Sequence, residues 1–248
     1  SITLSKEIRD KLVSLSQKAG TSMFMTMMAA FQVLLYRITG QDDIVVGTPI
    51  AGRHYKEIEG LVGFFVNTLA IRTRFEGTET FTEVLEKVRN TTLDSYKHQN
   101  IPFEQLVDHL EITRELNKNP VFQVMFTFES EGSVNGIGED GESLTLEGMR
   151  ITSNRSSNTH SISKFDLTAH MFEHQEGVSI SLEYSVDLFE EESVQKLASH
   201  FDELIKNITN GISNTDNTKS ITDLSILTNE EEHQILVEWN DTKGTYPE

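Results

Sequence analysis

Two amphipathic segments open the chain and predict helices. Between residues 6 and 19 the apolar side chains recur on one face, with Ser5 before the run as a cap and Gly20 directly after it. Residues 23–38 are apolar on nearly all sides, and Gly40 follows them closely. The first segment therefore predicts a half-buried helix, and the second predicts a helix that other elements enclose.

Alternation of apolar and polar residues predicts the strands of a sheet. Residues 44–50 are rich in β-branched side chains, and residues 67–75 and 121–129 alternate with the period of a strand. The strongest signal spans 165–186, where two alternating runs are joined by a polar turn, as in a β-hairpin. A further strand is predicted at 144–152.

Helical spacing returns between and after these strands. It spans residues 80–97, restarts at Phe103 after a break, and covers 190–210. Helices mixed with the strands of one sheet are typical of a layered α/β domain. The core of this domain is expected to end near Ile212, because residues 213–248 are mostly polar and contain one short helical run.

The composition is acidic and free of cysteine. The 248 residues include 39 acidic and 21 basic side chains, which gives a formal net charge of −18. Such a surface repels nucleic-acid phosphates and anionic membranes, so neither is an expected partner. The absence of cysteine excludes a disulfide scaffold, a thiolate metal site and a cysteine nucleophile. Together with the lack of a signal-peptide pattern, it indicates a cytoplasmic protein.

The sequence contains no complete catalytic constellation. It lacks the G-x-S-x-G turn of serine hydrolases and the glycine-rich loops that bind phosphate. His170 and His174 have the spacing of zinc ligands on a helix, but they lie in a strand-like segment. His54 and His98 lie in predicted loops, and neither has an adjacent carboxylate to orient its imidazole. We therefore predict no catalytic residue and no metal site within this chain.

Three blocks of sequence, taken in order, resemble the later signature motifs of nonribosomal peptide synthetase condensation domains. They are GFFVNTLAIR at 63–72, HQNIPFE at 98–104, and RELNKNPVFQVMF at 114–126. The segments 34–53 and 164–167 also resemble that family. The resemblance implies an α/β fold similar to a chloramphenicol-acetyltransferase lobe, in which helices flank a mixed β-sheet.

The resemblance also implies that the chain is one of two lobes. The family's catalytic motif, His-His-x-x-x-Asp-Gly, lies in the first lobe, and no pair of adjacent histidines occurs in this sequence. Residues 1–212 are therefore similar to the C-terminal lobe alone, and we expect this fragment to be inactive by itself. Residues 213–248 resemble the start of the linker that leads to an adenylation domain, through Leu227–Glu230 and Trp239–Thr242.

Two groups of candidate site residues follow from the resemblance. The first group is expected to form one wall of the substrate tunnel and consists of Thr48, Gly63, Phe64, Asn67 and Thr68. Gly63 leaves room for a close approach of backbone, and Asn67 offers a donor and an acceptor to an amide-like chain. Packing of tight turns and strands is the alternative role for this group. The second group is expected to be structural and consists of Arg53, His98, Gln99, Pro102, Phe103, Glu104, Arg114 and Asp166.

The function that the resemblance implies is peptide-bond formation between a carrier-bound acyl thioester and a carrier-bound aminoacyl amine. The implied partners are the N-terminal lobe, the upstream and downstream peptidyl carrier domains, and an adjacent adenylation domain. No cofactor is expected to bind directly, since phosphopantetheine is carried by the carrier domains. Two alternatives stay open: a free-standing acyltransferase that uses coenzyme A or a carrier, and a non-catalytic docking module for a carrier protein.

Overall fold

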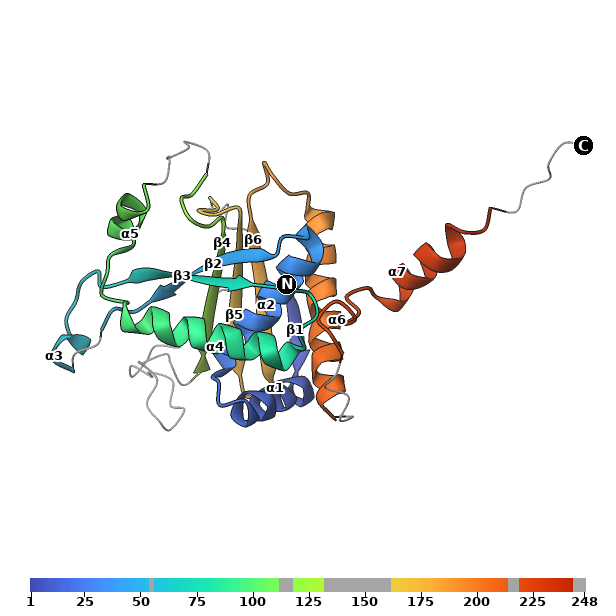
Figure 1. Cartoon of the computed structure of the whole chain (residues 1–248), viewed down its shortest axis with the longest axis horizontal. Coiled ribbons are helices and arrows are strands. Elements are labelled where there is room, and N and C mark those ends of the chain that lie inside the picture. Colours follow the sequence, from blue (N-terminus) through green and yellow to red (C-terminus); the bar gives the residue numbers. More distant parts are fainter. Residues whose placement is uncertain (54–55, 112–117, 132–161, 214–218, 243–248) are drawn as a thin grey trace, which may run out of the picture.

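The computed structural model describes residues 1–53, 56–111, 118–131, 162–213 and 219–242. In this part of the chain, a six-stranded mixed sheet has the order β1-β6-β5-β4-β2-β3 (Figure 1). Strand β4 is parallel to β2 and β5, and the other neighbouring pairs are antiparallel. The strands are β1 Ile2–Ser5, β2 Asp43–Ile50, β3 Asn67–Arg74, β4 Val124–Ser130, β5 Leu167–His174 and β6 Gly177–Tyr184.

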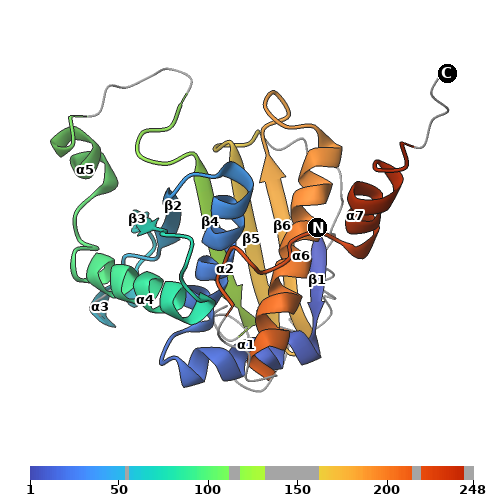
Figure 2. The same ribbon diagram turned by 45° about the vertical axis from the view of Figure 1, so that its right-hand side comes forward.

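The long helices lie on one face of this sheet, as Figure 2 shows. At their centre, α2 packs against α1, α4, α6 and strand β2. A π-helical turn, Gln234–Glu238, continues α7. The helices are α1 Lys6–Lys18, α2 Met23–Thr39, α3 Lys56–Glu59, α4 Phe81–Lys97, α5 Phe103–His109, α6 Glu191–Ser213 and α7 Asn229–His233.

Helix α2 is enclosed, as its uninterrupted apolar surface predicts. All residues from 25 to 35 are buried. The polar side chain of Gln32 is satisfied within the core: its Nε2 donates to the carbonyl oxygen of Ile71 at 2.9 Å, and its Oε1 accepts from Thr73 Oγ1 at 2.8 Å. These bonds tie α2 to β3. Among the described residues, no single helix has the length and hydropathy of a membrane span. Helices α1 and α2 have that length and hydropathy only when taken together, and the angle between them is 104°.

The predicted helices and the predicted hairpin are confirmed, and the strands differ in two places. Strand β4 begins at Val124, because Val121 has a left-handed φ of 72° that is incompatible with a strand. Strand β1 was not predicted, because it has four residues and only Leu4 among them is buried, which is too short a run to show alternation. The strand predicted at 144–152 lies outside the described residues.

A segment after α6, residues 219–226, belongs to the same core and is called the strap below. Ile221 and Leu224 are 0% and 8% exposed. Arg37 Nη1 donates to the carbonyl oxygens of both residues, at 2.8 and 2.6 Å. The main-chain N–H of Ile221 donates to the carbonyl oxygen of Glu79 at 2.7 Å. The expectation that the core ends with α6 is therefore wrong. The three apolar side chains of the strap stand among polar neighbours and give little hydropathy signal, whereas hydrogen bonds to the strap main chain hold it in place.

The strap predicts a large stability cost for a substitution beyond α6. Because Ile221 is fully buried, Ile221→Ala should lower the free energy of unfolding by about 2–5 kcal/mol, which urea titration measures. The matched control is Val237→Ala, which removes methyl groups from a side chain that is 52% exposed and should change stability by less than about 0.5 kcal/mol. Equal effects of the two substitutions would show that the strap is not part of the core.

The carboxylate of Asp43 joins β2 to the edge strand β3. Asp43 accepts hydrogen bonds from Arg72 Nε and Nη2 at 2.8 and 2.6 Å, and from Arg74 Nε at 3.0 Å. The bonds from Arg72, together with those from Arg74, lower the pKa of Asp43 to about 2. Both arginine side chains are more than half exposed, so solvent screens the attraction.

This pair predicts a definite pH dependence. The pKa of Asp43 is lower in the folded chain than its ordinary value of 3.8, so its contribution to stability is present above about pH 4 and is lost as the pH falls toward 2. Asp43→Asn should therefore reduce the melting temperature at neutral pH, and the difference from the wild type should narrow as the pH is lowered from about 5 to about 2. A difference that stays constant over this range would exclude a charged pair at this position.

Candidate functional site

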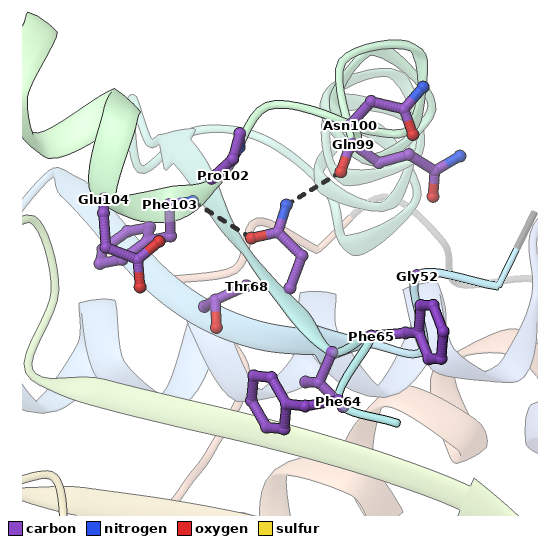
Figure 3. Close-up of a pocket in the computed structure, with 11 residues that line it drawn as sticks. Gly52, Phe64, Phe65, Thr68, Gln99, Asn100, Pro102, Phe103 and Glu104 are labelled. Carbon is purple, nitrogen blue, oxygen red and sulfur yellow. Dashed lines mark hydrogen bonds between the residues drawn. The ribbon is translucent and has the colours of Figure 1, made fainter. Parts of the chain in front are cut away.

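Two of the three sequence motifs meet at one pocket of about 390 Å³ (Figure 3). The pocket lies between the loop that enters β3 and the corner that joins α4 to α5, which is residues 98–102 and is called the α4–α5 corner below. Its walls combine aromatic rings with amide and hydroxyl groups and the carboxylate of Glu104. The lining residues are Gly52, Phe64, Phe65, Val66, Asn67, Thr68, Gln99, Asn100, Pro102, Phe103 and Glu104.

The side chain of Asn67 fixes the α4–α5 corner to the first residue of β3. Its Nδ2 donates to the carbonyl oxygens of Gln99 and Ile101, at 2.9 and 2.8 Å. Its Oδ1 accepts from the main-chain N–H of Phe103 at 3.1 Å. Pro102 has no N–H and interrupts the helix here, so the amide side chain supplies partners that helical geometry does not provide. The expectation that Asn67 offers its donor to a substrate is corrected by this geometry, because both N–H donors are used inside the protein.

Main-chain hydrogen bonds shape the corner further at His98. Its N–H donates to the carbonyl oxygen of Ser95, and its own carbonyl oxygen accepts from the N–H of Ile101, both at 3.1 Å. The imidazole is exposed and does not line the pocket. In the last turn of α4, Lys97 donates to Asp94 at 2.7 Å, and this bond lowers the pKa of the Asp94 carboxyl.

Arg53 organises the loop between β2 and β3. Its Nη1 donates to the carbonyl oxygens of Ile58 and Leu61, at 2.6 and 2.8 Å. The guanidinium carbon lies 4.5 Å from the centre of the Phe65 ring, which is a cation–π contact. The neighbouring Phe64 also lines the pocket, and its side chain is 91% exposed.

Gly52 is required where this loop leaves β2. Its φ is 65°, a left-handed value that side chains disfavour, and an added Cβ would lie 1.8 Å from the carbonyl oxygen of Phe65. Gly52 was not among the predicted site residues, although it stands in the segment 34–53 that resembles the family. Its place directly after a predicted strand was the available signal.

The third motif supports the pocket from behind through Phe122, which is 2% exposed. The centre of its ring lies 5.3 Å from that of Phe103 and 5.6 Å from that of Phe165. Gly47 makes this packing possible, since a Cβ at that position would lie 2.1 Å from the Phe122 ring. The aromatic wall of the pocket therefore rests on the sheet.

The remaining predicted residues that the structure describes lie outside the pocket. Thr48 is 3% exposed within β2 and does not line the pocket. Gly63 is exposed in the loop that Arg53 holds. Asp166 joins two strands through its main chain, since its N–H donates to Gln123 and its carbonyl oxygen accepts from the N–H of Ser185. Arg114 and His54 lie outside the described residues.

The two histidines with zinc-like spacing bond to hydroxyl groups instead. His170 Nδ1 lies 2.9 Å from Thr127 Oγ1, and His174 Nε2 lies 3.1 Å from Ser179 Oγ. Within the part of the chain that the structure describes, no three side chains of histidine, aspartate or glutamate are grouped to hold a metal ion. The chemistry of the candidate site is therefore that of amides, a hydroxyl, a carboxylate and aromatic rings.

The hydrogen bonds of Asn67 predict a local effect of its removal. In Asn67→Ala the N–H of Phe103 loses its acceptor, and its hydrogen exchange should be about tenfold faster, since a net hydrogen bond contributes about 1–1.5 kcal/mol. Asn90→Ala, an exposed asparagine on α4, is the matched control and should leave that amide unchanged. Equal exchange of the Phe103 amide in the wild type and in Asn67→Ala would contradict the role given to this side chain.

Comparison with known proteins agrees with the motifs. The family model of the condensation domain matches residues 1–236. A subunit of linear gramicidin synthase from Brevibacillus parabrevis is 44% identical over 246 residues, which cover 99% of this chain and 5% of that protein. Gramicidin S synthase 2 of Brevibacillus brevis is 40% identical over 242 residues, which cover 98% of this chain and 5% of that protein. The chain thus spans less than a tenth of the length of these relatives.

Solved structures share the fold. A four-domain nonribosomal peptide synthetase, in its holo form with AMP and glycine, matches 93% of this chain with a TM-score of 0.77 at 23% identity, over 18% of its own length. The first condensation domain of the CDA synthetase matches 92% of this chain with a TM-score of 0.67 at 18% identity, over 47% of its own length. The predicted fold, a chloramphenicol-acetyltransferase-like arrangement of a mixed sheet and helices, is confirmed. The chain belongs to the condensation domain family of nonribosomal peptide synthetases.

Proposed function

We propose that this chain is the C-terminal lobe of a condensation domain that forms peptide bonds within a nonribosomal peptide synthetase. The observation that carries the proposal is the pocket in which the motifs at 63–72 and 98–104 meet, closed by the three hydrogen bonds of Asn67. Coverage supports it as well, since the chain matches about half of a solved condensation domain and leaves room for a second lobe of similar size.

The proposed reaction joins two carrier-bound substrates. The amine nitrogen of the aminoacyl group attacks the carbonyl carbon of the acyl thioester, so that a C–N bond forms and the C–S bond breaks. The amine loses one proton, and the departing phosphopantetheine sulfur gains one. A tetrahedral oxyanion intermediate forms after the attack and before the C–S bond breaks. The histidine that accepts the proton of the amine belongs to the His-His-x-x-x-Asp-Gly motif, which this sequence does not contain.

The role proposed for this lobe is to orient the carrier-bound substrate and to shield it from water. Phe64 and Phe103 present aromatic surface that excludes water from one side of the pocket. Thr68, Gln99 and Asn100 add a hydroxyl and two amides, groups that match the alternation of methylenes and amides in a phosphopantetheine arm. This chemistry fits the arm as a tethered substrate, and a correctly held arm lowers the entropic cost of bringing the two substrates together.

The proposed partners are the N-terminal lobe of the same domain, an upstream and a downstream peptidyl carrier domain, and an adenylation domain that follows residues 213–248. The strap is then the part of this linker that stays bound to the lobe, because it is buried in the core. The proposed location is the cytoplasm. The proposed organisation is a lobe of residues 1–212 followed by a linker of residues 213–248, in which Ile221 and Leu224 of the strap pack into the core of the lobe.

Reconstitution tests this proposal. The chain alone and the chain combined with an N-terminal lobe are given carriers loaded with an acyl and an aminoacyl group, and the dipeptide is measured by mass spectrometry. The chain alone should give no product above uncatalysed aminolysis, and the combination should turn over. Alanine in place of the second motif histidine of the added lobe should slow turnover by about 10²–10⁴-fold.

Two further variants make the outcome decisive. His54→Ala and His98→Ala remove the loop histidines of this chain, and each should leave the turnover of the combined lobes unchanged. Product formed by the chain alone, and retained in both variants, would contradict the assignment of the essential histidine to the other lobe.

A further inference from the structure

Among the lining residues that the structure describes, one side chain carries the charge of the pocket. Of the eleven residues that line it, Glu104 alone is ionisable. It stands in the first turn of α5, is exposed to solvent, and in Figure 3 its carboxylate points toward Thr68 across the pocket. Arg53, the basic residue next to the lining residue Gly52, directs its guanidinium to loop carbonyls and to the Phe65 ring.

The other walls offer little to an incoming anion. Phe64, Val66, Pro102 and Phe103 are apolar. The amide N–H groups of Asn67 are used to hold the α4–α5 corner. The carboxylate of an incoming ligand would therefore be repelled by Glu104. No cationic side chain among the described lining residues offsets this repulsion.

The dimensions limit what can enter. A volume of about 390 Å³ lies near the lower end of the range of about 300–1,000 Å³ for small-molecule pockets. It suits a single amino-acid side chain with its tether better than a folded segment of another protein. The aromatic rim at Phe64, which is 91% exposed, adds apolar surface for such a side chain to cover.

We propose that this pocket receives the side chain of a carrier-bound aminoacyl group and that Glu104 makes it select uncharged or cationic side chains over acidic ones. The inference rests on the proposed function. We take an effective dielectric constant of about 40, between the values for water and for a protein surface. Two like charges about 6 Å apart then repel each other enough to disfavour an acidic side chain about tenfold relative to an uncharged one. Glu104 is thus a specificity-determining residue and takes no part in the bond-forming step.

A matched pair of substrates isolates the charge. The chain joined to its N-terminal lobe is assayed with carriers that bear glutaminyl or glutamyl groups, which have nearly the same shape and differ in charge. In one arm the pair is placed on the upstream carrier and in the other on the downstream carrier, which identifies the substrate whose side chain enters the pocket. We expect kcat/KM to favour glutaminyl by about tenfold in one arm, and this preference should shrink in about 1 M salt, where the Debye length is about 3 Å.

Variants assign the preference to Glu104. Glu104→Gln should bring the ratio of the glutaminyl to the glutamyl rate close to one, and Glu104→Lys should reverse it. Glu86→Gln removes an exposed carboxylate of α4 that lines no part of this pocket and should keep the wild-type ratio. Each ratio compares two substrates with the same variant, so a general loss of activity lowers both rates and leaves the ratio unchanged.

The possible failures are distinct. Equal rates for glutaminyl and glutamyl groups in both arms of the wild type, or an unchanged preference in Glu104→Gln, would overturn the role of Glu104 and leave the proposed function intact. A preference lost equally in Glu86→Gln would assign it to the overall charge of −18 instead. No dipeptide from any substrate pair would be a failure of the proposed function itself.

Discussion

Three hydrogen bonds from the side chain of Asn67 determine the shape of the candidate site. They join the start of β3 to the α4–α5 corner at two carbonyl oxygens and one N–H. A corner that contains proline leaves main-chain groups without helical partners, and an amide is the side chain that can both donate to and accept from such groups. This contact links the motif at 98–104 directly to the motif at 63–72.

The position of Asn67 depends in turn on the sheet and on α2. Gln32 at the centre of α2 binds β3 through Ile71 and Thr73, and Phe122 supports the corner through its contact with Phe103. These contacts lie in a close-packed interior that resists displacement. The pocket is therefore built on packed elements, and Phe64 and Glu104 are among its solvent-exposed lining residues.

Much of this fold could be predicted from the sequence, because helical and strand periods are properties of local runs. The hairpin of β5 and β6 and the enclosed helix α2 are examples. The strap and β1 could not be predicted, since their stability comes from contacts with distant residues, such as those of Ile221 with Arg37 and Glu79. The motifs indicated Asn67, but its partners could not be foreseen, because a sequence pattern does not show that Asn67 and a residue 32 positions later line one pocket.

The central claim is that the pocket held by Asn67 is a wall of the condensation site. It is tested most directly by the phenylalanine amide resonances of the complete domain, recorded with a carrier whose aminoacyl group is attached through a stable amide in place of the thioester. We predict shifts of Phe64 and Phe103, which line the pocket, and none of Phe201, which is 1% exposed in the core. Shifts confined to Phe172, which lies in a separate hollow between Ser1 and the strands β4, β5 and β6, would contradict the claim and place the substrate on the open face of the sheet.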